Sequence, residues 1–156
     1  MKKSLALLLG LMMLWFSCSA RADSKLIQAE SEEAFYGEWE MEEVYMDGIP
    51  VGFDTLEWLA GLVYDGGSNY KVSEARLVIS KGKAKLVVGT GENAKTKKSA
   101  KTFSNGVLIL NDPMGILGED VRLALCEDGR LTSEASIRYG ILSFQIKVYM
   151  CRAEDV

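Results

Sequence analysis

The chain has 156 residues, with 18 Lys and Arg against 22 Asp and Glu, and it contains no histidine. The lack of histidine removes the commonest general base and a common zinc ligand, and the formal charge of −4 makes the chain a poor candidate for nucleic-acid binding. No Gly-x-Ser-x-Gly, Walker or dinucleotide fingerprint occurs, so we expect no enzyme, no cofactor and no metal site.

Residues 1–22 are predicted to be a secretory signal peptide, because a basic start and a short apolar run precede a small-residue cleavage site that ends at Ala22. We therefore expect an exported protein, either periplasmic or extracellular. The apolar run is shorter than the about 20 residues that span a bilayer, so no transmembrane segment is expected in the mature chain. Lipid attachment at Cys18 is the alternative, which Trp15 disfavours because bulky residues are poorly suited to that signal.

Charge is distributed unevenly along the predicted mature chain, residues 23–156. Residues 23–66 carry 12 acidic residues and 1 basic residue, whereas residues 67–101 carry 2 acidic and 9 basic ones. We interpret this asymmetry as two segments that face each other on neighbouring walls of a single domain.

The first elements are a polar segment and an alternating strand. Residues 23–36 are predicted to form an N-terminal arm or a short helix, and the domain proper covers residues 37–156. In the strand predicted over residues 37–46, period-two alternation places Trp39 and Met41 on the buried face. The alternation shifts near residue 43, which predicts a bulge.

A helix is predicted after Asp54, which can cap it, with Glu57 three residues later as in a capping box. Its apolar positions follow helical spacing, and they are Leu56, Leu59, Ala60 and Val63, flanked by Trp58 and Leu62.

Every later segment is predicted to be a strand, and turn residues separate them. The strand ranges are 70–80, 84–90, 99–104, 107–111, 120–126, 131–138 and 141–151. With residues 37–46 they give an all-β fold with one short helix, an eight-stranded antiparallel up-and-down barrel. Tight turns close one end, and the long connections, including the helix in the first one, lie at the open end. A β-sandwich is the alternative fold.

Two cysteines remain in the predicted mature chain, Cys126 and Cys151. Alternation places both on the outer face of their strands, and an exported protein permits disulfides. We expect a bridge between them, with two unpaired thiols as the alternative.

The chain resembles the lipocalin-like barrels of the calycin group. These proteins begin their first strand with Gly-x-Trp, here Gly37-Glu38-Trp39, and place an arginine after the eighth strand, where this chain has Arg152. Many members carry Thr-Asp-Tyr where this chain has residues 127–129, Glu-Asp-Gly, so the resemblance is to an outlying bacterial member. It implies structural roles for Gly37, Trp39 and Arg152, with Arg152 stacked on Trp39 where the last strand closes onto the first.

The candidate ligand-binding residues are those expected at the wall, rim or lid of the open end. They are Met41, Tyr45, Trp58, Leu62, Met114 and Ile116. The alternative is that these side chains pack as core and leave no void. A lysine cluster near the same rim either holds an anionic head group or is a solvated loop, and it comprises Lys95, Lys97, Lys98 and Lys101.

Two functions are consistent with these features. The first is an exported, non-catalytic barrel that binds a small apolar or amphipathic molecule. The second is an exported protein-binding module, inhibitor-like or structural in the envelope, with a filled core and with residues 23–36 projecting into a partner.

Overall fold

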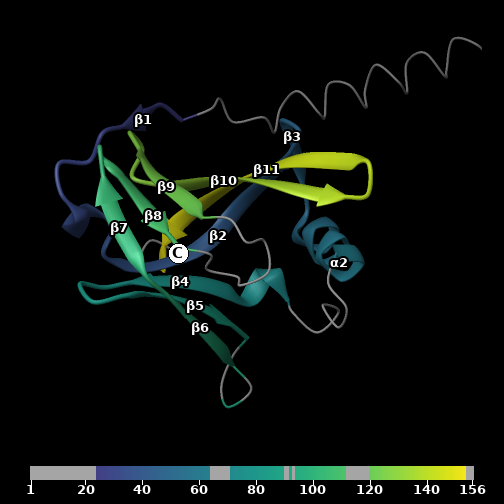
Figure 1. Cartoon of the computed structure of the whole chain (residues 1–156), viewed down its shortest axis with the longest axis horizontal. Helices are drawn as coiled ribbons and strands as arrows, with labels where there is room; N and C mark the ends of the chain where they lie inside the picture. Colours follow the sequence, from purple (N-terminus) through teal and green to yellow (C-terminus); the bar gives the residue numbers. More distant parts are fainter. Residues whose placement is uncertain (1–23, 64–70, 90–91, 93, 112–119, 154–156) are drawn as a thin grey trace, which may run out of the picture.

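The structure is a computed structural model that describes residues 24–63, 71–89, 92, 94–111 and 120–153. Most of these residues lie in antiparallel strands of one sheet, which curls into a nearly closed barrel with little helix (Figure 1). The strands are β1 (Leu26–Ile27), β2 (Gly37–Met46), β3 (Ile49–Val51), β4 (Ala75–Ile79), β5 (Ala84–Val88), β6 (Lys95–Ser99), β7 (Lys101–Ser104), β8 (Val107–Leu110), β9 (Val121–Cys126), β10 (Leu131–Tyr139) and β11 (Leu142–Arg152). The helical elements are η1 (Glu32–Phe35), α2 (Phe53–Val63) and η3 (Val72–Glu74). None of the helices in the described ranges is long and apolar enough to span a membrane.

The order of strands round the sheet is β6-β5-β4-β2-β11-β10-β9-β8-β7. Along this path each neighbour is the next strand in the chain, except that the short β3 comes between β2 and β4 and that the last strand, β11, meets β2. There β11 pairs with β2, and Met150 lies opposite Met41 and Arg152 opposite Trp39. The last strand therefore closes onto the first, as the sequence predicts.

The expected count of eight strands is wrong. The single strand predicted over residues 99–104 starts earlier and is divided at Ala100 into β6 and β7. At this break the Ser99 hydroxyl donates hydrogen bonds to the carbonyls of Ala100 and Asn111, so a side chain replaces part of the regular ladder. Short strands β1 and β3 add to the count by pairing with β9 and β2.

A bulge in β2 decides which of its side chains face the barrel interior. The register with β11 skips Glu42, because Met41 lies opposite Met150 and Glu43 lies opposite the preceding residue, Tyr149. The extra residue shifts the alternation, so Val44 and Met46 continue the inner face while Tyr45 lies on the outer face. The bulge thus lies beside the predicted position.

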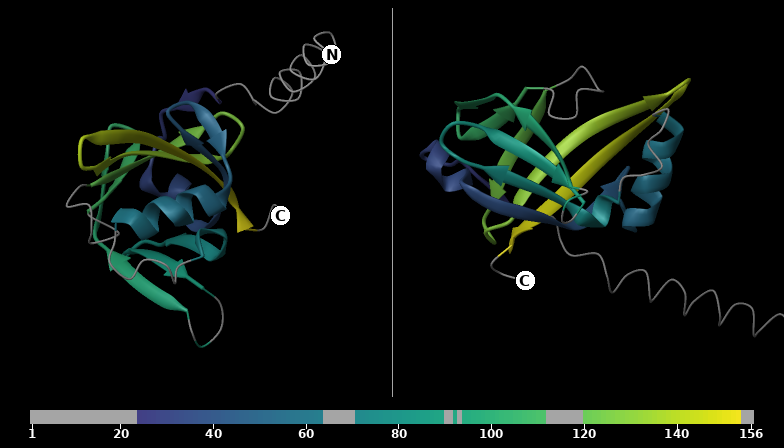
Figure 2. Two further views of the ribbon diagram at one scale, coloured as in Figure 1. Left: turned by 90° about the vertical axis from the view of Figure 1, so that its right-hand side faces the viewer. Right: turned by 90° about the horizontal axis from the view of Figure 1, so that it is seen from below.

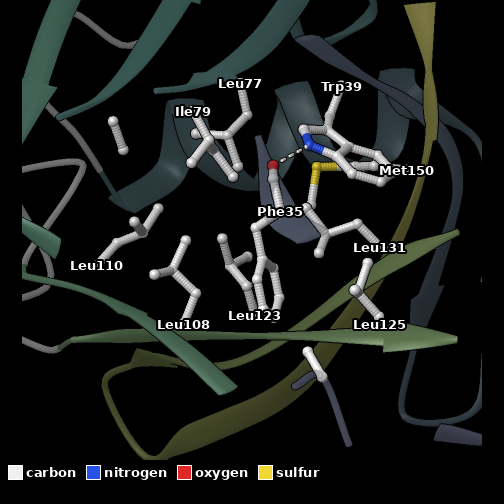
Figure 3. Close-up of a cluster of buried hydrophobic side chains, with 12 residues drawn as sticks. Phe35, Trp39, Leu77, Ile79, Leu108, Leu110, Leu123, Leu125, Leu131 and Met150 are labelled. Carbon is white, nitrogen blue, oxygen red and sulfur yellow. Dashed lines mark hydrogen bonds between the residues drawn. The ribbon is translucent and has the colours of Figure 1, made fainter. Parts of the chain in front are cut away.

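One end of the barrel is filled by its own side chains (Figure 3). The buried cluster there draws residues from the strands and from the N-terminal segment: Ala29, Phe35, Trp39, Leu77, Ile79, Ala84, Leu108, Leu110, Leu123, Leu125, Leu131 and Met150. Phe35 is fully buried, and its ring meets the edge of Phe103 with 6.1 Å between centroids. We call this the closed end.

The N-terminal segment, residues 24–36, lies across the closed end. Its backbone is bound to two turns, because Glu127 N donates to Lys25 O and Ala29 N donates to Gly106 O. Gly106 has a φ of +77°, and a Cβ there would lie 2.3 Å from Gln28 Cγ, so only glycine allows this approach. Residues 24–36 therefore do not project from the barrel, and the helix that they contain is the short 3₁₀ helix η1.

Helix α2 lies at the opposite end from η1, next to the β10–β11 hairpin (Figure 2). Its Phe53 and Leu56 pack against a second buried cluster, formed by Val44 and Ile146. Leu56 thus takes the inward position predicted for it. The side chains of residues 59–63 lie outside the described part of the chain.

Candidate functional site

The inward-facing side chains of the barrel are not buried equally along its length. On β10, Leu131 near the closed end is fully buried, whereas Ser133 and Ala135, further along the same inner face, are partly exposed. On β9, Leu125 and Leu123 are buried, and Val121 beyond them is partly exposed. Solvent therefore reaches the inner face in the half of the barrel away from the closed end, which we call the open half.

The same gradient recurs on β5, whereas on β2 and β11 the inner face is buried again further along, at Val44 and Ile146. The partly exposed inner-face residues of these three strands are Met41 on β2, Leu86 and Val88 on β5, and Val148 on β11. Cross-strand pairing shows that they share this face: Leu86 lies opposite Leu77, and Val148 opposite Val44, both of which belong to buried clusters. The lining of the open half thus combines apolar side chains with the hydroxyl of Ser133 and, on β6, Lys97 opposite Leu86.

Of the residues predicted to bind a ligand, Met41 lies on the inner face and packs against the main cluster. Tyr45 lies on the outer face, because the bulge at Glu42 reverses the alternation. Its ring meets Tyr149 edge-on at 5.8 Å, and its hydroxyl donates to Glu43 at 3.3 Å. Burial and the Glu43 carboxylate raise the pKa of Tyr45 above its ordinary value. The expected wall position of Tyr45 is wrong.

Of the remaining predicted lining residues, the structure describes the side chain of Trp58 alone. Trp58 is 65% exposed on α2. It follows Leu56 by two positions, which places it about 200° round the helix from that buried residue. The side chain of Leu62 and all of Met114 and Ile116 lie outside the described residues.

The three residues that the resemblance assigns to the framework come together at the closed end. The Arg152 guanidinium stacks on the Trp39 ring at 4.4 Å from its centroid and donates to the carbonyls of Tyr36 at 2.8 Å and Ala34 at 3.0 Å. The indole N–H of Trp39 donates to Phe35 O at 2.9 Å. Gly37 has a φ of +138°, and a Cβ there would lie 2.7 Å from an Arg152 nitrogen.

No disulfide joins Cys126 and Cys151 in the structure. Leu125 pairs with Leu131, and Leu131 pairs with Met150, so the two cysteines lie at the same level with β10 between them. Two strand spacings amount to about 9.6 Å, which exceeds the about 7 Å between Cα atoms that a disulfide can bridge. The expected bridge is absent for this reason.

A charged cluster on the outer face was not found from the sequence, where residues 127–130 were interpreted only as a tight turn. The Arg130 side chain, 9% exposed, donates to Asp128 at 2.8 Å, Glu43 at 3.0 Å and Ser24 at 2.6 Å. Its guanidinium lies 4.4 Å from the centroid of the Tyr149 ring. The cluster connects the N-terminal segment, the turn before β10 and the bulge of β2, so it joins three parts of the fold.

These contacts also set the acidity of the cluster. Burial alone would raise the pKa of Asp128, but hydrogen bonds from Ser24 and Arg130 outweigh it and hold the pKa below its usual value. Burial lowers the pKa of Arg130, but the hydrogen bonds and charges of Asp128 and Glu43 raise it by more. Arg130 therefore stays charged. The bulge residue Glu42 adds a longer ion pair at 3.4 Å.

Beside this cluster a shallow groove of about 220 Å³ opens between β2 and the start of α2. It is lined by Glu42, Glu43, Val44, Tyr45, Pro50, Val51, Gly52 and Phe53. Its lining therefore includes Tyr45 of the outer face as well as Val44 and Phe53 of the second buried cluster. Within the described ranges, no three His, Cys, Asp or Glu residues gather closely enough to hold a metal ion.

No family model, curated protein or solved structure matches this chain. The resemblance to lipocalin-like barrels therefore depends on the residues of this chain alone, chiefly Gly37, Trp39 and Arg152. Any functional conclusion must likewise come from the chemistry of the described residues.

Proposed function

We propose that this protein is an exported, non-catalytic barrel that binds a small apolar or amphipathic molecule in its open half. The observation that carries the proposal is the gradient of burial along the inner faces of β5, β9 and β10, as from Leu131 at the closed end to Ala135 in the open half. Export rests on the sequence of residues 1–22.

Water reaches apolar side chains on part of the inner face of the barrel. Small barrels either fill their interior with side chains or hold one small ligand, and here the two ends of the inner face differ. A ligand that removed about 200 Å² of apolar surface from water in the open half would gain about 5 kcal/mol, from which the cost of association is subtracted. No described side chain in this half suggests covalent chemistry, so binding without transformation is the simplest function.

A matched pair of alanine substitutions tests the proposal. Ala135 lies on the inner face of β10 in the open half, whereas Ala124 lies on the outer face of β9 opposite Thr132. We expect a fluorescent fatty-acid probe to bind the wild type, Ala135→Phe to weaken binding by about tenfold or more because the ring fills the open half, and Ala124→Phe to leave binding unchanged. Lack of probe uptake by the wild type, or equal binding by both variants, would contradict the proposal.

The protein-binding module is the second candidate, and one observation favours it. Large apolar side chains are exposed on the β2–β3 hairpin, α2 and the β10–β11 hairpin: Ile49 (61%), Trp58 (65%), Ile141 (101%) and Leu142 (53%). Since residues 24–36 are bound to the barrel, this candidate would use these side chains and not a projecting arm. In envelope fractions, the double variant Trp58→Ser with Ile141→Ser should then lose a cross-linked partner that the wild type captures. An unchanged pattern of cross-links would count against this candidate.

A further inference from the structure

Strands β5 and β6 carry a concentration of lysine. Lys85 on β5 and Lys97 and Lys98 on β6 define what we call the lysine ribbon, and the two strands contain no acidic residue. The ribbon lies along one margin of the sheet (Figure 1). None of its three lysines forms an ion pair with a described residue.

The two oppositely charged segments of the sequence meet only in part. Arg76 pairs with Glu38 at 2.6 Å where β4 adjoins β2, and Lys101 pairs with Glu32 at the closed end. The ribbon lies one strand further from β2 than Arg76 does, because β4 separates β5 from β2. The acidic and basic segments are thus adjacent where β2 pairs with β4, and the ribbon lies beyond this contact.

The lysines of the ribbon point to both faces of the sheet. Lys85 and Lys98 are direct cross-strand partners on the outer face, in the same row as Val78 and Glu38. Lys97 is opposite Leu86, in the row of Leu77 and Trp39, and so lies on the inner face. Like charges directly opposite each other destabilise a sheet. The repulsion between Lys85 and Lys98 is therefore unfavourable in the folded state, and a nearby anion would reduce it.

The edge of β6 offers backbone groups as well as charge. Among the residues that the structure describes, β6 pairs with β5 along one edge only. Alternate residues of a strand direct N–H and C=O groups to opposite edges, so the outer edge of β6 presents donors and acceptors between the lysines. An alternative role for lysines on an edge strand is to hinder unwanted pairing with other chains. That role predicts that no partner binds at β6.

We propose that the outer edge of β6 receives an extended acidic segment of a partner protein as an added strand. Main-chain hydrogen bonds to β6 would give affinity, as in other strand additions. The side chains of an added strand alternate between the two faces, so successive carboxylates reach Lys97 on one face and Lys98 with Lys85 on the other. A flat anionic membrane would meet only one face, which is why an acidic strand suits the ribbon better.

The test uses the full chain and two labelled peptides of equal charge. The first is an acetylated Thr-Glu-Glu-Val-Glu-Glu-Thr peptide, and the second carries N-methyl groups on alternate residues that remove N–H donors. By fluorescence anisotropy at low salt we expect the first peptide to bind and the second to bind about tenfold more weakly or worse. Equal binding of both peptides would show charge attraction alone and would overturn the proposal, as would no binding of the first.

Substitutions locate the binding on the ribbon. Lys98→Glu should weaken binding of the first peptide by about tenfold, whereas Lys25→Glu, the same change at an exposed lysine outside the ribbon, should not. Protection of the β6 amides from hydrogen exchange on adding the peptide to wild-type protein gives a readout that needs no variant. An added strand would be refuted by a lack of this protection, by an equal effect of Lys25→Glu, or by binding to anionic vesicles in place of the peptide.

Discussion

Arg152 connects the end of β11 to the start of β2 through three separate contacts. Its guanidinium lies over Trp39 and donates to the carbonyls of Tyr36 and Ala34. The planar fork of an arginine can make both hydrogen bonds while it stacks, which a lysine ammonium cannot do. The residue therefore fixes where the last strand meets the first.

Replacing Arg152 should weaken the closed end. We expect Arg152→Ala to lower the free energy of unfolding by about 2 kcal/mol and Arg152→Lys to restore less than half of that loss. Urea denaturation measures both variants, with Arg138→Ala on the exposed part of β10 as a control that should change stability little. Full rescue by lysine would show that charge alone matters.

The charged cluster round Arg130 gives stability a specific pH dependence. Hydrogen bonds from Ser24 and Arg130 hold the folded pKa of Asp128 below its unfolded value of about 4. The stabilisation is therefore present above that value and is lost as the pH falls through the folded pKa.

We expect Asp128→Asn to be less stable than the wild type at pH 7 by about 1 kcal/mol, since the 42% exposed carboxylate is screened by solvent. At acidic pH the difference should shrink, because the wild-type carboxyl is then protonated as well. Urea unfolding of both proteins, repeated from neutral to acidic pH, measures this difference in stability. A difference that stays constant over this range would mean that Asp128 does not titrate as described.

At the scale of elements, the N-terminal segment completes the barrel. Lys101, whose side chain is 5% exposed, pairs with Glu32 of η1 and lies 5.4 Å from the centroid of the Tyr36 ring, and burial lowers the pKa of Lys101. The same segment places Phe35 in the main cluster. Polar composition predicted an arm or a short helix, and contacts with distant strands fold this segment over the closed end.

Phe35 therefore contributes to the stability of the whole domain. We expect Phe35→Ala to cost about 4 kcal/mol, as removing a fully buried phenylalanine leaves a cavity. Leu26→Ala in the same segment should cost far less, because Leu26 is 55% exposed. Chemical denaturation compares the two, and a similar small loss in both would mean that the segment is not docked in solution.

At the scale of the whole molecule, barrel closure decides the state of the cysteines. The order β9-β10-β11 places a strand between Cys126 and Cys151, so the arrangement of strands excludes a bridge that alternation and export permitted.

We expect both cysteines to be alkylated without prior reduction once the protein is unfolded. In the native state Cys151, which is partly exposed, should react before Cys126, which is 1% exposed. Iodoacetamide labelling followed by peptide mass spectrometry distinguishes them. Finding the two cysteines in one disulfide-linked peptide would contradict the strand order.

The sequence by itself determined the local structure and much of the architecture. Alternation and turns such as Asn105-Gly106 predicted strands close to those observed, because these signals act between near neighbours. The resemblance carried by Gly37, Trp39 and Arg152 placed the last strand beside the first.

Only the tertiary structure decided which side chains share a site. The bulge at Glu42 moved Tyr45 to the outer wall, Ala100 divided one predicted strand, and residues far apart in the chain gathered round Arg130. These outcomes depend on pairing between segments up to about a hundred residues apart, and a one-residue shift in register reverses every side chain beyond it. Local patterns cannot specify such pairings, because their free energy arises from contacts that exist only once the barrel has closed.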